Sequence, residues 1–267
     1  MDVEAKNQFG DQEFVAFEAA CLAVPSEKTV LPPPALNHFR SYWVDPLAGI
    51  VDTPVLLEDQ FHAGEPISAM VMYDWFFCNP VEKWLDEERW SPIWHPDDHL
   101  YIYGIEYAAP EYWQVEVSNQ FGGNQLLTVF GPVALVVPTQ KEGHEPPVDL
   151  DHYLLYQVVP PYPEVLKPVY LVDQFIAGQE ATVTVPIYFA NPVIKTHGPD
   201  VTPIQHPNAH LVFYGLDISG SFSTGDWITA TNQFGAQEIV AFYPGEGPTV
   251  LGVPSAKLWW ETYEPLP

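Results

Sequence analysis

The chain has 267 residues, of which 35 are acidic and 9 are basic, so its formal net charge is −26, and 47% of its residues are apolar. The apolar content argues against a disordered polymer. The shortage of basic residues argues against nucleic acid and anionic membrane surfaces as partners, because both require basic patches. No segment is long and apolar enough to span a membrane. The two cysteines, Cys21 and Cys78, lie in different half-units at slightly different registers and are not expected to pair.

A short motif, Asn-Gln-Phe-Gly or Asp-Gln-Phe, recurs along the chain. Its copies begin at Asn7, Asp59, Asn119, Asp173 and Asn232. A copy and the next but one, such as those at Asn7 and Asn119, are separated by about 113 residues, which indicates an internal duplication. We interpret the motif as architectural in its four later copies. Their Gln and Phe residues are Gln60, Phe61, Gln120, Phe121, Gln174, Phe175, Gln233 and Phe234.

Each of these copies lies inside a half-unit that opens with His and an aromatic or aliphatic run, and closes with Pro-x-x-Lys. The openings start at His38, His99, His152 and His210, and the closes end at Lys83, Lys141, Lys195 and Lys257. A further close ends at Lys28 without an opening before it. The chain therefore contains part of a half-unit followed by two pairs of half-units.

Within the half-units, apolar residues alternate with polar ones. The alternation covers residues 55–61, 115–121, 169–175 and 228–234, and it predicts half-buried strands. A second β-rich run follows, as at residues 125–137 and 181–189. The Asp or Asn of each motif is expected to bond the backbone of the following turn. No segment has apolar residues at the helical period, and 29 prolines would interrupt most helices.

Proline runs predict the boundaries between domains, because such runs form stiff spacers. The expected parts are an incomplete β half-unit at residues 1–30, a β-sandwich at 36–141, a second at 150–257 and an aromatic tail at 258–267. Each sandwich would be built from two pseudo-symmetric half-units. The predicted fold is all-β.

Four strings of the chain form a recognisable set. They are Gln-Phe-Gly, Leu-Ala-Val-Pro-Ser-Glu-Lys at residues 22–28, His-Phe-Arg-Ser-Tyr at 38–42 and Phe-Cys-Asn-Pro-Val-Glu-Lys at 77–83. Together they resemble an uncharacterised family of secreted bacterial and archaeal β-repeat domains, in which the openings often read His-Phe-Lys-Cys-Tyr and the closes carry a second Cys. The resemblance covers nearly the whole chain. It implies an extracellular location and no known activity.

The resemblance also implies which residues lie opposite one another. Cys78 matches a family cysteine, whereas the position of its partner holds Ser41. The other matched pairs are Ile102 with Val136, Leu155 with Ala190 and Phe213 with Gly252. These pairs are expected to touch across neighbouring strands, three of them as apolar packing in place of a bridge.

The His-Pro-x-x-His joints between half-units are the best candidates for a metal site. The first joint contains His95, Asp97, Asp98 and His99, and the second contains His206, Asn208 and His210. The first could supply a cluster for zinc or copper, but the second lacks the carboxylates. We therefore favour a structural role in closing the loop, and expect no metal and no cofactor. The Asp97–Asp98 pair is interpreted as a solvated turn instead of a catalytic pair, so no enzymatic activity is expected.

A loop rich in tryptophan interrupts the repeat. Trp84, Trp90 and Trp94 could stack on sugar rings, as aromatic platforms do in lectin-like sites. The equivalent loop at residues 196–205 contains no tryptophan. Covering a sheet edge or contacting a neighbouring molecule is favoured over sugar binding.

The two ends of the chain suggest a mode of assembly. Near the start, Asn7, Gln8 and Phe9 lie in an incomplete half-unit whose strand edges would be unpaired, and near the end Trp259, Trp260 and Tyr263 form an aromatic tail. We hypothesise that the tail of one chain completes the first half-unit of the next, giving an open filament. A longer repeat array, of which this sequence is a fragment, would explain the same feature.

The expected function is therefore that of an extracellular structural protein that binds other copies of itself head to tail, in a fibre or a surface layer. A carbohydrate- or surface-binding adhesin module, with a glycan as its partner, is the alternative.

Overall fold

The computed structural model describes residues 2–7, 10–15, 36–46, 51–86, 89–218, 226–242 and 249–264. These residues confirm the all-β prediction. The chain divides into two compact units, Met1–Val30 and Leu31–Pro267. In the first unit, β1 (Asp2–Asn7) and β2 (Gly10–Val15) form an antiparallel hairpin in which Asn7 pairs with Gly10. Two predicted interface residues, Gln8 and Phe9, lie outside the described residues.

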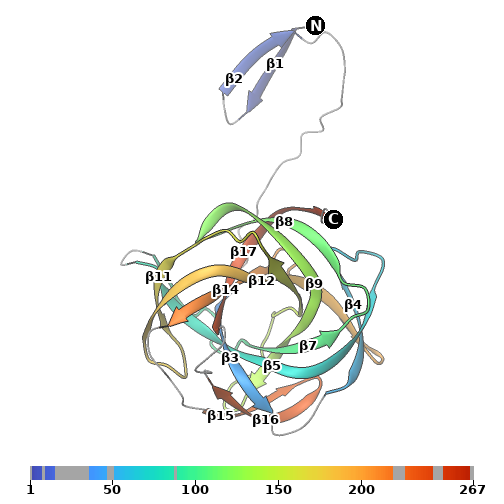
Figure 1. Cartoon of the computed structure of the whole chain (residues 1–267), viewed down its shortest axis with the longest axis vertical. Helices are drawn as coiled ribbons and strands as arrows, with labels where there is room; N and C mark the ends of the chain where they lie inside the picture. The colour runs from blue at the N-terminus through green and yellow to red at the C-terminus, as the bar shows by residue number, and fades with distance from the viewer. Residues whose placement is uncertain are drawn as a thin grey trace. The chain divides into compact units, whose positions relative to one another are not determined.

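In the second unit, eight antiparallel strands close into a cylinder. In the order of their pairing they are β3 (His38–Pro46), β5 (Ile67–Trp84), β7 (His99–Glu106), β9 (Gly122–Lys141), β10 (Tyr153–Val159), β12 (Gln179–His197), β14 (His210–Ile218) and β17 (Thr249–Thr262). Each strand pairs with the next, and β17 pairs back to β3 through Leu251 and Gly252. In Figure 1 these strands surround a common centre.

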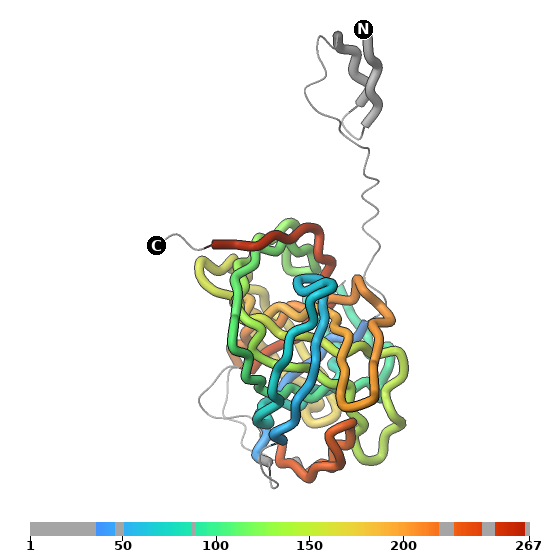
Figure 2. The backbone as a smooth tube through the Cα atoms, turned by 90° about the vertical axis from the view of Figure 1, so that its right-hand side faces the viewer, coloured from blue at the N-terminus to red at the C-terminus, as the bar shows by residue number. Residues whose placement is uncertain are grey.

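Further strands extend this cylinder as hairpins. They are β4 (Thr53–Asp59), β8 (Glu111–Asn119), β11 (Lys167–Val172), and β15 (Asp226–Asn232) with β16 (Gly235–Phe242). The strands β4, β8, β11 and β15 each pair on one edge with the strand that follows in the chain. In Figure 2 the β4–β5 hairpin, in blue and cyan, lies on the outside of the unit.

The other edge of each hairpin pairs with a long strand two half-units away. Thus β4 pairs with the end of β12, β11 with the end of β5, β8 with β17, and β15 with β9. Two short strands, β6 (Trp90–Ser91) and β13 (Asp200–Thr202), also pair with the ends of β5 and β12. Residues 36–141 and 150–257 therefore share one sheet instead of each closing its own, because a hairpin leaves one edge open and the other repeat covers it.

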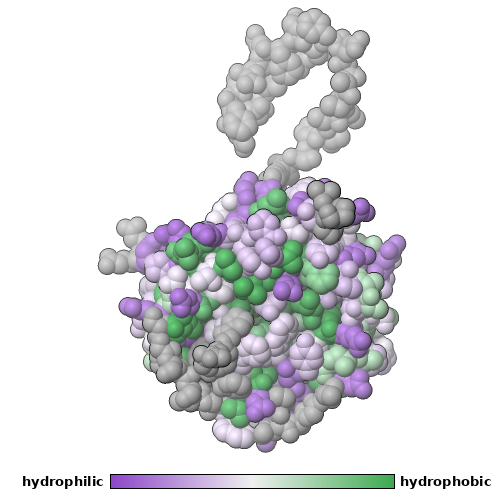
Figure 3. All heavy atoms as spheres, in the orientation of Figure 1, coloured by the Kyte–Doolittle hydropathy of each residue, from purple (hydrophilic) through white to green (hydrophobic). Residues whose placement is uncertain are grey.

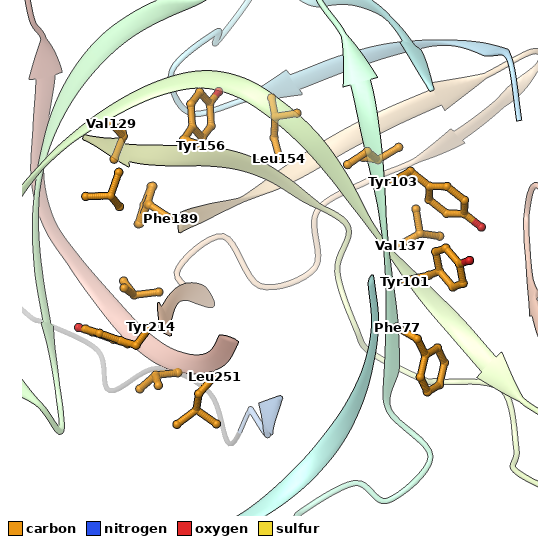
Figure 4. Close-up of a cluster of buried hydrophobic side chains, with 14 of the residues drawn as sticks. Phe77, Tyr101, Tyr103, Val129, Val137, Leu154, Tyr156, Phe189, Tyr214 and Leu251 are labelled. Carbon is orange, nitrogen blue, oxygen red and sulfur yellow. The ribbon is translucent and has the colours of Figure 1, made fainter. Parts of the chain in front are cut away.

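The cylinder has an apolar layer on each face. The inner layer is built from the cylinder strands and includes Phe39, Cys78 and Ile102. The outer layer lies between the cylinder and the hairpins. Figure 4 shows Phe77, Tyr101, Tyr103 and Tyr214 of this outer layer pointing away from the centre of the ring. Alternation along each strand thus places one set of residues inside and the next set under a hairpin.

The residue pairs implied by the resemblance lie directly opposite one another. Ser41 pairs with Cys78, Ile102 with Val136, Leu155 with Ala190, and Phe213 with Gly252. At the last pair, a Cβ atom on Gly252 would lie 2.9 Å from Cε1 of Phe213, so the glycine makes room for the ring. The expected contacts across neighbouring strands are confirmed.

Candidate functional site

The lysine that closes each half-unit lies over the motif phenylalanine of the next half-unit. The distances from Nζ to the ring centre are 5.3 Å for Lys83 and Phe121, 4.4 Å for Lys141 and Phe175, 5.6 Å for Lys195 and Phe234, and 4.9 Å for Lys257 and Phe61. The last contact joins the fourth half-unit to the first. The same interaction therefore follows the whole circumference of the cylinder.

Burial lowers the pKa of three of these lysines. It lowers the pKa of Lys83 and Lys195 to about 8 and that of Lys257 to about 7, because an ammonium group loses its hydration. The motif glutamines contribute bonds at the same places, as where Lys83 donates to Gln120, which also contacts His38. Four of the five Gln-Phe motifs therefore connect neighbouring half-units.

The motif Asp or Asn connects opposite half-units. Its side chain bonds the tyrosine of the opening two half-units away, with the pairs Asp173–Tyr42, Asn119–Tyr214, Asp59–Tyr156 and Asn232–Tyr103. The aspartates accept this bond at Oδ2 and the asparagines donate it from Nδ2. In each case Oδ1 accepts a backbone N–H of the next turn, as where Phe61 N donates to Asp59 Oδ1 over 3.0 Å. Equivalent bonds follow Asn119, Asp173 and Asn232. The predicted bond from the motif to the following turn is confirmed.

Two of these motif residues are carboxylates, and each has a different neighbour. Asp173 forms a buried ion pair with Arg40, whose Nη1 lies 3.4 Å from Oδ2. Asp59 instead contacts Nδ1 of His62 over 2.8 Å and accepts a bond from Asn191 Nδ2 over 2.9 Å. Both carboxylates are buried, so each requires compensating donors.

A groove on the surface combines aromatic rings with carboxylates. Its cavity volume is about 650 Å³, and its lining residues are Trp84, Leu85, Asp86, Pro168, Val169, Tyr170, Glu180, Ala181, Thr182 and Asp217. We name it the aromatic groove. The Trp84 and Tyr170 rings meet edge to face with their centres 5.9 Å apart, and Trp90 stacks beside Trp84 at 6.3 Å. This arrangement offers ring faces and hydrogen-bond acceptors to one ligand.

Four strands assemble the groove from distant parts of the chain. In β5 and β11, Trp84 pairs with Tyr170, and Tyr170 pairs on its other side with Glu180 of β12. Asp217 follows in β14, opposite Thr182. Since neighbouring strands are about 4.8 Å apart, Trp84, Tyr170 and Glu180 form one row across the sheet. Asp217 is displaced from this row by two residues along β12.

The equivalent place in the other repeat lacks these groups. The same pairing brings Thr196 of β12 opposite Leu56 of β4, and Leu56 opposite Ser68 of β5. Thus Thr196, Leu56 and Ser68 stand where the groove has Trp84, Tyr170 and Glu180. The aromatic groove therefore departs from the pseudo-symmetry of the fold.

The structure separates the three tryptophans that were expected to act together. Trp84 lines the groove, and Trp90 stacks on it while its Nε1 donates to Glu82 over 2.7 Å. Trp94 is 57% exposed and does not line the groove. Tyr170, Glu180 and Asp217 were not predicted from the sequence, because they come from strands that are remote from the tryptophan loop.

The residues of the His-Pro joints also separate. His95, Asp98 and His206 line a second cavity of about 460 Å³ together with Asp149 and Tyr153. His99 and His210 are instead buried in strands, where burial lowers the pKa of His99 to about 3 and that of His210 well below its ordinary value. Across the described residues, no cluster of three or more His, Cys, Asp or Glu side chains is suited to hold a metal ion.

The predicted interface residues of the tail belong to the sheet. Trp259 and Trp260 lie in β17 and pair with Glu116 and Val115 of β8. The Trp260 ring lies 5.3 Å from that of Phe61, and Tyr263 N donates to Tyr112 O. One edge of this strand is therefore already paired within the chain.

The surface of the unit shows a mixed character. On the face drawn in Figure 3, hydrophobic residues in green lie between hydrophilic ones in purple. A helix able to cross a membrane is not found in the described part of the chain.

These observations define a class of protein: an antiparallel cylinder of repeated half-units, with a candidate ligand groove outside its symmetry. A family model described as a repeat of unknown function, DUF7450, matches residues 2–129 and again residues 110–242. The two matches cover most of the chain, so the chain belongs to this family and carries two of its repeats. No curated protein and no solved structure shows significant similarity to the chain.

Proposed function

We propose that this protein is a carbohydrate-binding module whose ligand lies in the aromatic groove. The faces of Trp84 and Tyr170 can stack on the C–H faces of sugar rings, and the carboxylates of Glu180 and Asp217 can accept hydrogen bonds from sugar hydroxyls. The volume of about 650 Å³ is within the range of small-molecule sites. An extracellular location, as the resemblance implies, is part of this proposal.

The observation that carries the proposal is the difference between the two repeats. Strand pairing is equivalent at Trp84–Tyr170 and at Thr196–Leu56. If the aromatic rings served only to stabilise the fold, equivalent rings would be expected at both places. Rings present at one place only are better explained by a ligand, and Tyr170 is 44% exposed although it is apolar over most of its surface.

A glycan array followed by calorimetry tests the proposal. We expect a ligand whose affinity falls at least about tenfold in Trp84→Ala, because stacking and burial of one aromatic face contribute more than about 1.4 kcal/mol. Trp94→Ala is the matched control, since this exposed ring lies outside the groove. A screen without a ligand, or a ligand whose affinity is equal in both variants, contradicts the proposal.

Self-association into a fibre or surface layer is a second candidate, supported by the last strand of the sheet. Residues 256–262 of β17 pair with β8 on one edge, and the described strands include none on the other edge at Trp259–Thr262. Trp259 is 42% exposed there. An open edge next to an exposed ring favours pairing with a further strand.

Negative-stain electron microscopy over a range of concentrations tests this second candidate. We expect filaments that are lost in Trp259→Glu and retained in Trp227→Glu, whose ring is 67% exposed elsewhere on the sheet. Monomers at every concentration would exclude self-association.

A further inference from the structure

Three side chains from distant strands meet next to the aromatic cluster of the first half-unit. Lys257 Nζ donates to Asn191 Oδ1 over 2.9 Å, and Asn191 Nδ2 donates to Asp59 Oδ2 over the same distance. The lysine therefore contacts one end of an amide whose other end contacts a carboxylate.

The surroundings of this contact are apolar. Lys257 Nζ lies 4.9 Å from the ring centre of Phe61, 5.9 Å from that of Phe189 and 5.7 Å from that of Trp260. Burial lowers the pKa of Lys257 to about 7, although nearby Asp59 opposes the shift. A large fraction of the amine is thus unprotonated at neutral pH, which is the form that acts as a nucleophile.

We propose that Lys257 and Asn191 join in an intramolecular amide bond, with Asp59 as the group that transfers the proton. The bond would link β17 to β12, two strands that are separated in the cylinder by β14. This covalent bond is independent of the ligand proposed for the groove.

The chemistry balances without an added reagent. The lone pair of Lys257 Nζ attacks Cγ of Asn191, the Nζ–Cγ bond forms, and the carbonyl electrons move to Oδ1. In the tetrahedral intermediate, Nζ and Nδ2 are bonded to the same carbon, so the Asp59 carboxylate that contacts Nδ2 comes within reach of Nζ. Asp59 then accepts a proton from Nζ and passes it to Nδ2. The carbonyl re-forms as the Cγ–Nδ2 bond breaks, and ammonia leaves. One amine and one primary amide thus become one secondary amide and one ammonia, with Asp59 regenerated.

The carboxylate is held in position for this role. Its Oδ1 contacts His62 Nδ1 over 2.8 Å, and Tyr156 donates to Oδ2 over 2.9 Å. Both neighbours are buried, and water is therefore excluded from one side of the reacting groups. Such fixed geometry brings the amine and the amide together as an intramolecular pair.

The other half-units show where these three residue types recur together. Around Lys83, the equivalent positions hold Val253 in place of the amide and Asn119 in place of the carboxylate. Around Lys195, they hold Val137 and Asn232. Neither of these lysines therefore has both an amide and a carboxylate at the equivalent positions.

A second complete set exists at Lys141, Asn79 and Asp173, and it is arranged differently. Lys141 donates to Gln174, and Asp173 pairs with Arg40. Both polar atoms of the Asn79 amide are buried without a hydrogen-bond partner. We therefore assign the bond to Lys257 and Asn191 only, and the second set serves as an internal control.

Intact-mass spectrometry of the purified full chain under denaturing conditions tests the proposal. We expect a mass lower than that of the sequence by one molecule of ammonia, and a branched tryptic peptide that joins Lys257 to Asn191. The full sequence mass in the wild-type protein overturns the proposal, and this reading requires no variant to fold.

Variants at the two sets locate the bond. The loss of ammonia should disappear in Lys257→Arg and in Asp59→Asn, and it should persist in Lys141→Arg, the equivalent substitution. A cyclic imide at another asparagine also releases ammonia. Such a product would persist in Lys257→Arg and would give no branched peptide, and that outcome also overturns the proposal. Asn191 cannot form this imide with the next residue, because Pro192 has no backbone N–H.

Discussion

The two repeats, residues 36–141 and 150–257, have the same strands and the same lysine–phenylalanine contacts, yet they differ around the motif aspartates. Asp173 is paired with Arg40, whereas the residue equivalent to Arg40 in the other repeat is Leu154 and Asp59 contacts His62. Where the motif has Asn, at Asn119 and Asn232, no charge has to be compensated. A carboxylate at the motif position is thus accompanied in both cases by an additional donor, because a buried charge requires compensation.

The repeats differ again at the aromatic groove. One repeat has Trp84, Tyr170 and Glu180 in a row, and the other has Thr196, Leu56 and Ser68. Positions that both repeats share hold the cylinder together. Sites of binding and modification are therefore expected at positions where the two repeats differ.

A feature common to both repeats sets the largest expected effect. Each half-unit opens with a buried histidine, and burial lowers the pKa of His99 and His152 to about 3 and shifts His38 and His210 in the same direction. Unfolded histidines take up protons near pH 6.5. The stability that these groups contribute is thus complete above pH 6.5 and is lost as the pH falls.

Asp98 acts in the opposite direction, because burial raises its pKa to about 6. Between about pH 6 and pH 4, the unfolded state binds two protons at His99 and His152, whereas the folded state binds one at Asp98. The unfolded state therefore binds one proton more than the folded state. The folding equilibrium constant should therefore fall at least about tenfold per pH unit in this range. Urea unfolding at pH 7, 6, 5 and 4 measures the effect, and an unchanged midpoint would be inconsistent with the buried neutral histidines.

The next largest effect on stability is expected from breaking the ion pair between Asp173 and Arg40. Arg40→Leu introduces the residue type of the other repeat and leaves a buried carboxylate without its cation, so it should destabilise the fold by about 3–5 kcal/mol. Adding Asp173→Asn should restore much of the loss, because the Asn119 and Asn232 half-units use this amide. Urea unfolding compares the variants, and a double variant no more stable than Arg40→Leu alone would contradict this account.

The row of groove residues can be introduced at the equivalent place in the other repeat by three substitutions. The triple variant Thr196→Trp, Leu56→Tyr and Ser68→Glu should create a second site, since the backbone pairing is equivalent. Leu56 is 46% exposed, so the exposed substitutions should change stability by only about 0.5 kcal/mol each. Calorimetry with a ligand found on the glycan array should show two sites per chain. An unchanged stoichiometry would mean that the row alone does not make the site.

The smallest effect concerns the support of Tyr170. Gly178 lies against the Tyr170 hydroxyl, and a Cβ atom there would overlap it. Gly178→Ala should therefore displace the ring and weaken ligand binding by a few-fold, on the order of 1 kcal/mol. Gly123→Ala is the control, since its Cβ would lie 3.7 Å from Ser118 Oγ. Equal affinities in the two variants would remove Tyr170 from the site.

Local features of this fold follow from the sequence alone. Alternation predicted strands such as those that end at Asp59 and Asn119. The matched pairs at Cys78 and Gly252, which the family resemblance implied, lie at the expected register. Residues within one half-unit are close in the chain, so a short pattern contains the information. The same pattern, however, suits a sandwich or a closed cylinder equally well.

The partners of each half-unit could not be predicted in this way. The pairing of β4 with β12 or of β8 with β17 depends on how all the open edges are satisfied together. The aromatic groove and the Lys257 contact have the same origin. Trp84 was found as an unusual residue in its loop, but Tyr170, and Asn191 beside Lys257, become neighbours only when the cylinder closes.

The closure of β17 onto β3 gives the four half-units a cyclic order. The neighbours of each half-unit are thus fixed by its place on the circle and not by the peptide links between units. A circularly permuted chain, opened in the joint at residues 142–150 and rejoined through a flexible linker, would retain every strand pair of the cylinder. The arrangement of the strands in this protein therefore does not depend on the position at which the chain is opened.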